Sequence, residues 1–180
     1  RPEANPENII LGNTWRFTVL TSRLIRVEFS NSAEFEDRAT QIVFYRDFPK
    51  CDYRVERSET SVQVDTEHLS LTFDEKGGRE SLRIFLKSMG ACWKYGQKLP
   101  PQLKGTTRTL DEADGAIDLE NGLCSRAGYT LLNDSGGLVL SEDGWFARKN
   151  PEEDLYFFGY GHDYIACVRD YCRLTGGTPM

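Results

Sequence analysis

The sequence lacks the features of a disulfide scaffold, a membrane protein and a nucleic-acid-binding protein. Its five cysteines are odd in number, and no pair of them shows the spacing of a metal site. We therefore expect reduced thiols, which are typical of a cytoplasmic protein. No apolar run approaches the roughly 20 residues of a membrane helix, and no signal-peptide pattern opens the chain. The net charge of −6 provides no positive field to attract nucleic acid.

Histidines and nucleotide-binding motifs are also scarce. Only His68 and His162 are present, and neither has a second His or a Cys at ligand spacing, so we predict no metal site. We expect His68 on the surface at the start of a strand, and His162 beside a helix cap. Gly159 and Gly161 form a G-x-G, but the third glycine of a dinucleotide-binding loop does not follow.

Alternating apolar and polar residues dominate the chain. Apolar side chains recur at every second position over residues 15–19, 25–29, 61–65, 69–73 and 82–86. This period places one set of side chains on a core and the other set in water, so we expect Arg16, Thr18, Arg26 and Glu28 to be solvated. Turn-forming Gly, Asn and Asp separate these segments. Many short strands with frequent turns predict a mainly β, antiparallel sandwich or barrel.

The end of the chain follows a different pattern. Asp163 can cap a helix, and Ile165, Val168 and Cys172 then recur at helical spacing. Gly176 and the glycine after it supply a stop signal. We therefore predict a short helix followed by a linker over residues 162–180.

Polar residues in two loop-like stretches are the candidates for ligand contact. Residues 99–115 contain two prolines and two glycines and indicate a long loop, which carries Asp111, Glu112 and Asp114. Sequence gives no distance between these carboxylates, and we favour ligand contact over direct catalysis as their role. Arg108 and Arg126 lie in similar stretches, where an arginine either holds a carboxylate or contacts substrate hydroxyls.

An aromatic run covers residues 156–161. Its rings could stack on a sugar, or they could belong to a strand that is buried on both sides. We favour the buried strand.

Four stretches, read together, resemble α-glucosidases of glycoside hydrolase family 31. They are TVLTSRLIRVEFSNSAEFEDRATQ (18–41), LKGTTRTLDEADG (103–115), LENGLCSRAGYTLLNDSG (119–136) and DLYFFGYGHDYIACVRDYCRLTGGTP (154–179). The resemblance extends over nearly the whole chain, in the expected order.

This resemblance implies a galactose-mutarotase-like β-sandwich that precedes a catalytic (β/α)8 barrel. Residues 1–180 would form the N-terminal domain, with residues 162–180 leading toward the barrel. The catalytic aspartates would lie in the barrel beyond Met180, so no catalytic residue is expected in this chain. The whole enzyme would hydrolyse terminal α-linked glucose with retention and without a cofactor.

The resemblance also implies a sandwich loop that helps shape the sugar pocket. The matching positions are residues 111–114 and 125–128, which makes Asp111, Asp114 and Arg126 the expected substrate-binding residues. Relatives often have an acidic residue after the Ser-Arg pair, where this chain has Ala127, so no carboxylate contact is implied at that position.

Two other functions are compatible with a β-sandwich. A stand-alone carbohydrate-binding module would bind sugar without a barrel. A sugar mutarotase or epimerase would need a general acid and a general base in fixed positions, usually His with Glu or Asp. Neither histidine of this sequence has a suitable partner of that kind. The domain hypothesis further predicts an exposed apolar face where Tyr156, Phe158 or the terminal helix would meet the barrel.

Overall fold

The computed structural model describes residues 1–106, 114–116, 119–148 and 152–177. The helices are η1 (Pro6–Asn8), η2 (Glu75–Gly77), η3 (Arg79–Ser81) and α1 (Tyr164–Thr175). The strands are β1 (Ile9–Leu11), β2 (Trp15–Thr21), β3 (Leu24–Phe29), β4 (Arg54–Arg57), β5 (Ser61–Asp65), β6 (Leu69–Asp74), β7 (Arg83–Leu86), β8 (Ala91–Lys94), β9 (Gln102–Thr106), β10 (Glu120–Ser125), β11 (Thr130–Asn133), β12 (Val139–Ser141), β13 (Gly144–Phe146) and β14 (Glu153–Phe158).

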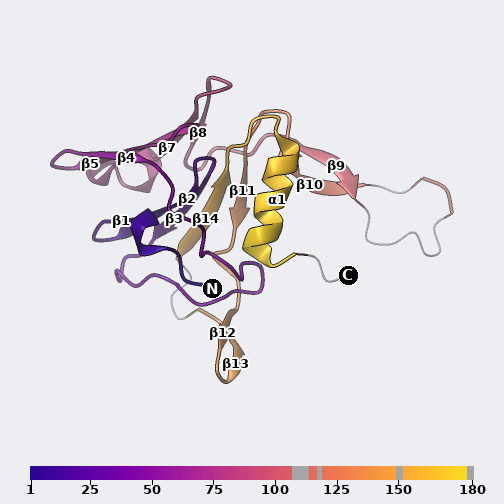
Figure 1. The fold of residues 1–180 in the computed structure, drawn as a ribbon, viewed down its shortest axis with the longest axis horizontal. Helices are drawn as coiled ribbons and strands as arrows, with labels where there is room; N and C mark the ends of the chain where they lie inside the picture. The colour runs from indigo at the N-terminus through magenta and orange to yellow at the C-terminus, as the bar shows by residue number, and fades with distance from the viewer. Residues whose placement is uncertain (107–113, 117–118, 149–151, 178–180) are drawn as a thin grey trace.

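Two antiparallel five-stranded sheets form a sandwich (Figure 1). The first sheet has the order β1-β2-β3-β14-β11, and the second sheet has the order β4-β5-β6-β7-β8. The predicted antiparallel β-sandwich with a C-terminal helix is therefore confirmed. Strand β14, close to the end of the chain, lies in the middle of the first sheet, where it pairs with β3 and β11.

The first sheet is covered on both faces. One face packs on the second sheet through an aromatic and aliphatic core that includes Trp15, Phe17 and Phe157. The other face packs on α1 and residues 43–48 through a second core that includes Tyr156 and Phe158. Side chains of a strand point alternately to opposite faces, so successive residues of β14 enter different cores. The buried-strand interpretation is confirmed for Tyr156–Phe158, which end β14, whereas residues 159–161 are buried but follow the strand.

The expectation of a solvated face on β2 and β3 is wrong. Arg16, Thr18, Arg26 and Glu28 are buried, with exposed fractions of 6% or less. Residues 36–48 lie over this face, and the carbonyl of Glu36 accepts hydrogen bonds from Arg16 and Arg26. Alternation therefore predicted the strands correctly, but it did not show that a third layer covers the polar face.

The stretch from residue 99 to 115 is not one continuous loop. Residues 102–106 form β9, which pairs with β10 across positions Gln102↔Ser125 and Thr106↔Glu120. The two strands make a hairpin that extends from the sandwich beside α1 (Figure 1). Register shifts interrupt the pairing, which explains why the sequence shows no clear alternation there.

Candidate functional site

Helix α1 begins and ends as the sequence predicts. The Asp163 Oδ1 atom accepts from the Ala166 amide at 3.2 Å, which satisfies one of the free donors of the first turn. Gly176 ends the helix at φ +85°, a conformation that glycine adopts without strain. The tail at residues 178–180 lies outside the described residues, so the predicted linker stays a prediction.

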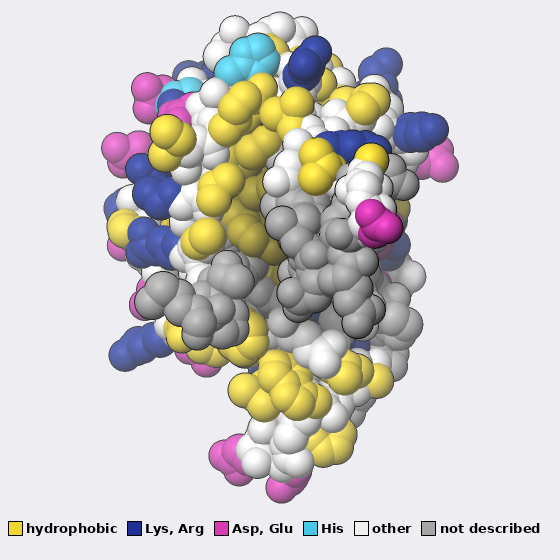
Figure 2. All heavy atoms as spheres, turned by 90° about the vertical axis from the view of Figure 1, so that its right-hand side faces the viewer, with side chains coloured by type: hydrophobic (Ala, Val, Ile, Leu, Met, Phe, Trp, Pro, Cys, Tyr) yellow, Lys and Arg dark blue, Asp and Glu magenta, His cyan; other side chains and the backbone are white. Residues whose placement is uncertain are grey.

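The outer face of α1 is apolar. Its inner face buries Ala166, Cys167 and Leu174 against the first sheet. The stripe noted in the sequence lies on the opposite side, where Ile165 is 85% exposed and Val168 is 47% exposed. Figure 2 shows hydrophobic side chains gathered in a band on the side of the molecule that carries α1 and the β9–β10 hairpin.

The predicted exposed apolar face is therefore present on the helix but not on the strand. Tyr156 and Phe158 are 0% and 1% exposed, so their expected exposure is wrong. The cause is the layer formed by α1 and residues 43–48, which covers the sheet face from which these two rings project: Tyr171 of α1 lies against Phe158, and Arg46 donates to the Tyr156 hydroxyl.

Two of the three predicted sugar-contacting residues, Asp114 and Arg126, lie at opposite ends of the β9–β10 hairpin. Asp114 is exposed and belongs to the connection beyond the Thr106↔Glu120 pair. Arg126 is exposed and directly follows β10, at the base of the hairpin, where its carbonyl lies 2.9 Å from His162 Nε2. Asp111 lies outside the described residues, as do Arg108 and Glu112. The hairpin register therefore separates Asp114 from Arg126, and sugar contact by all three predicted residues remains a prediction.

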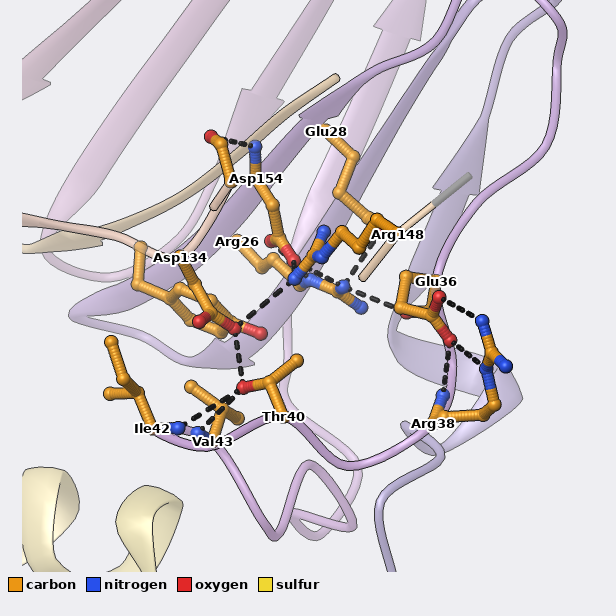
Figure 3. Close-up of polar contacts among 12 residues, drawn as sticks. Arg26, Glu28, Glu36, Arg38, Thr40, Ile42, Val43, Asp134, Arg148 and Asp154 are labelled. Atoms are coloured by element: carbon orange, nitrogen blue, oxygen red, sulfur yellow. Dashed lines mark hydrogen bonds and ion pairs between the residues drawn. The ribbon is translucent and has the colours of Figure 1, made fainter. Parts of the chain in front are cut away.

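A buried ion network, which the sequence did not predict, lies on the same face of the first sheet as α1, under residues 36–48 (Figure 3). Arg26 donates to both carboxylate oxygens of Asp154 at 2.7 and 2.8 Å, and its side chain is fully buried. Arg148 bridges Asp154 at 2.9 Å and Asp134 at 3.3 Å. Thr40 donates to the same Asp134 oxygen at 2.7 Å. These contacts tie β3 and β14 to the three connections that carry Thr40, Asp134 and Arg148.

The pKa values of Asp134 and Asp154 are shifted in opposite directions by burial and ion pairing. Burial alone would raise the pKa of Asp154, but the charge and hydrogen bonds of Arg26 overcome this effect and hold the pKa far below its usual range. Burial raises the pKa of Asp134, and the hydrogen bond from Thr40 only partly offsets it. Asp154 is therefore a charged anchor for Arg26.

Two facing carboxylates suggest a glycosidase pair, but these two are already engaged. A retaining mechanism needs one carboxylate free to attack the sugar. Asp134 and Asp154 are 0% and 1% exposed and share Arg148 between them. A hollow of about 600 Å³ opens beside the network, lined among others by Glu34, Phe35 and Glu152. The aspartate pair itself holds the fold together.

Neither histidine is paired with a carboxylate as an acid–base pair: the hydrogen bonds of His68 go to Ser22 and Arg23, and that of His162 goes to a carbonyl. His68 is partly buried, not simply a surface residue, and contacts Ser22 and Arg23. His162 contacts the Arg126 carbonyl and is not the helix cap. Within the described ranges, no group of three or more His, Cys, Asp or Glu side chains is placed to hold a metal ion.

All five cysteines belong to the described part of the chain and are free thiols. No helix there combines the length and apolar character needed to cross a membrane.

Comparison with known proteins gives a match in structure only. No family model matches the sequence, and no curated protein matches it. Two solved structures of the glycoside hydrolase family 31 dextranase from Flavobacterium johnsoniae are similar, one a mutant complexed with isomaltotriose and the other complexed with glucose. Each has a TM-score of 0.52 and 14% sequence identity, and the match covers 94% of this chain and 26% of the dextranase chain. The chain thus spans about a quarter of these relatives, with which it shares the fold of that segment.

Proposed function

We propose that this chain is the N-terminal, non-catalytic β-sandwich domain of a longer α-glucosidase of glycoside hydrolase family 31. The fold similarity carries the proposal, because it covers nearly all of this chain and only a quarter of the dextranase. The four sequence stretches described above support the same family. In this proposal the domain supports a catalytic barrel and helps to shape its carbohydrate pocket.

The state of the buried carboxylates supports a non-catalytic role. The facing pair Asp134 and Asp154 is bridged by Arg148 and withdrawn from solvent. A nucleophile held in this way would have to break two ion pairs before it reached a sugar. The chemistry of the parent enzyme is therefore assigned to another segment.

The outer face of α1 supplies a surface for that segment. Ile165 and Val168 are exposed on a helix whose other side is already packed. Exposed apolar side chains that gather on one face are typical of protein interaction sites. We assign this face to the contact with the catalytic barrel.

The β9–β10 hairpin is the part of the domain that we assign to the sugar. The hairpin extends beside α1, so a barrel docked on α1 would lie close to the hairpin. Asp111 and Asp114 in the connection between its strands, and Arg126 at its base, offer a carboxylate or guanidinium to substrate hydroxyls. The five free thiols support a cytoplasmic location.

Two measurements test the proposal. The purified chain should release no p-nitrophenol from an α-glucoside, whereas the longer protein that contains it should be active. In the longer protein, Asp114→Asn should raise KM more than kcat falls, and Asp143→Asn in the β12–β13 turn should change neither. Hydrolysis by the isolated chain would refute the assignment, and so would a longer protein that contains the chain but hydrolyses no α-glucoside.

A second candidate is a stand-alone carbohydrate-binding module. The observation that favours it is the β12–β13 hairpin, on which Trp145 and Phe146 are 42% and 48% exposed. Calorimetric titration of the chain with maltose and isomaltose tests it. Saturable binding that Trp145→Ala abolishes would favour the module over the supporting domain.

A further inference from the structure

Arg23, in the turn between β2 and β3, connects three parts of the fold. Its Nη1 atom donates to Asp163 Oδ2 at 2.8 Å, and its Nη2 atom lies 3.1 Å from His68 Nε2. Asp163 is the residue that caps α1 through the Ala166 amide. His68 immediately precedes β6 of the second sheet, and its Nδ1 atom lies 2.9 Å from Ser22 Oγ. One guanidinium therefore joins the second sheet to the first turn of α1.

The donor on Arg23 fixes the state of His68. A guanidinium has only N–H donors, so His68 Nε2 must act as the acceptor. The ring proton then resides on Nδ1 and is donated to Ser22 Oγ. Only the neutral imidazole satisfies both contacts, because a protonated ring has two donors and no acceptor.

The charges around His68 are mixed. On its own turn, Glu67 Oε2 lies 3.9 Å from Nδ1. Lys87, at the end of β7, and Arg23 are the neighbouring cations. The other charged or titratable groups that line the two hollows around His68 are Lys50, Cys51, Asp52, Tyr160, His162, Asp163, Arg169, Asp170 and Arg173. Burial first, and then the charge of Arg23, lowers the pKa of His68, although Glu67 opposes this shift.

We propose that Arg23, His68 and Asp163 form a pH-sensitive clamp that holds the first turn of α1 on the sandwich and loosens when His68 is protonated. This inference concerns the described residues alone and does not depend on the proposed function. Protonation would place two cations about 3 Å apart on atoms that now share a hydrogen bond. Arg23 would have to withdraw, and both of its contacts belong to the same rigid guanidinium plane.

The pH range follows from the direction of the shift. A histidine whose pKa is lowered in the folded state binds a proton more weakly than in the unfolded chain. Its contribution to stability is therefore complete above the unfolded value of about 6.5 and is lost as the pH falls below it. Asp163 does not contribute to this transition, since the hydrogen bonds from Arg23 and the Ala166 amide lower its pKa.

Nuclear magnetic resonance of the chain between pH 8 and pH 5 tests the clamp. His162 serves as an internal control, because its contact with a carbonyl survives protonation of the ring. We expect the pKa of His68 to lie below the usual value of about 6.5. The Ala166 amide should lose roughly tenfold in hydrogen-exchange protection with the same midpoint, as expected for the loss of one charged contact. The His68→Gln variant should abolish the pH dependence, while His162→Gln should retain it.

Two results would overturn the proposal. One is Ala166 protection that stays constant while His68 titrates. The other is a His68→Gln variant in which the Ala166 amide loses as much protection on lowering the pH as it does in the wild type. If His68→Gln fails to fold, the wild-type midpoints decide, because protection that follows His162 instead of His68 also refutes the clamp.

Discussion

Replacement of Asp154 by asparagine should be among the most destabilising single substitutions in this chain. Asp154 accepts two hydrogen bonds from Arg26, which has no exposed surface, and a third from Arg148. Asparagine has nearly the same shape, so the substitution leaves no cavity. It removes the negative charge and replaces one acceptor with an NH2 group that faces a guanidinium.

The magnitude follows from the burial of the pair. Removal of one partner from a buried ion pair costs about 3–5 kcal/mol, because the remaining charge stays in the interior without compensation. Glu28 lies 3.0 Å from Arg26 and retains part of the compensation, which favours the lower end. A domain of this kind has a total stability of about 5–15 kcal/mol. With a urea slope of about 2 kcal/mol per molar, a loss of about 3 kcal/mol lowers the midpoint by about 1.5 M.

Urea unfolding at pH 7, followed by tryptophan fluorescence, measures this shift, since Trp15 and Trp93 are both buried in the core. Because the pKa of Asp154 is lowered in the folded state, its stabilisation is complete above its unfolded value of about 3.9 and is lost as the pH falls further. The gap between the wild type and Asp154→Asn should therefore narrow toward pH 3. Glu7→Gln is the matched control, because it removes a carboxylate from the exposed ion pair with Lys50. It should leave the midpoint unchanged. A shift below about 0.5 M for Asp154→Asn at pH 7 would refute the reasoning.

Three further substitutions or reactions have defined outcomes. Gly159→Ala should lower the free energy of unfolding by about 1–3 kcal/mol, because the new Cβ would lie 2.6 Å from a leucine of the second sheet; Gly136→Ala, which meets no atom within 4 Å, should not. Thermal unfolding of both variants checks this, and equal melting temperatures would contradict it. Ile165→Ser should leave the stability of the isolated chain unchanged, whereas Leu174→Ser, at a position with no exposed surface, should destabilise it strongly in circular dichroism melts. The Cys167 thiol is buried, and burial raises its pKa, so it should react with Ellman's reagent only after urea is added.

The strands were predictable from sequence, but the covering of the first sheet was not. Trp15, Phe17 and Val19 alternate because one face of β2 meets the second sheet, and this local signal needs no knowledge of partners. Arg26 is buried because Asp154 is present 128 residues later. Nothing near Arg26 in the sequence indicates that partner, so alternation placed the arginine in water.

The helix shows the same limit. A capping aspartate and a terminal glycine are local signals, and both boundaries of α1 were correct. The apolar stripe through Ile165 and Val168 would ordinarily mark the buried side. Here the side that packs on the sheet carries Ala166, Cys167 and Leu174, so both sides of the helix are apolar. A sequence cannot show which of two apolar sides is already occupied.

The candidate site was predictable only where the resemblance supplied it. Asp111, Asp114 and Arg126 come from aligned motifs, and the hairpin register places Asp114 and Arg126 at opposite ends of one element. His68 was expected to be an ordinary surface residue because its partners come from separate turns. Ser22 and Arg23 precede β3, and Arg23 in turn reaches a residue at the start of α1. Such a constellation exists only after the three layers have assembled.

Polar contacts contribute much of what holds α1 on the first sheet. The helix buries few apolar side chains against the sheet, since its outer stripe remains exposed. Hydrogen bonds supply the rest: Arg23 holds its first turn, the Tyr160 hydroxyl donates to Asp170 at 2.7 Å, and the Leu174 carbonyl accepts from two amides of residues 44–45. The Tyr160–Asp170 contact is buried, whereas the Arg23–Asp163 pair is half-exposed, so this pair contributes less than core packing and depends more on pH. The first turn of α1, which carries the exposed Ile165, is therefore the part of the helix that the proposed protonation of His68 would loosen.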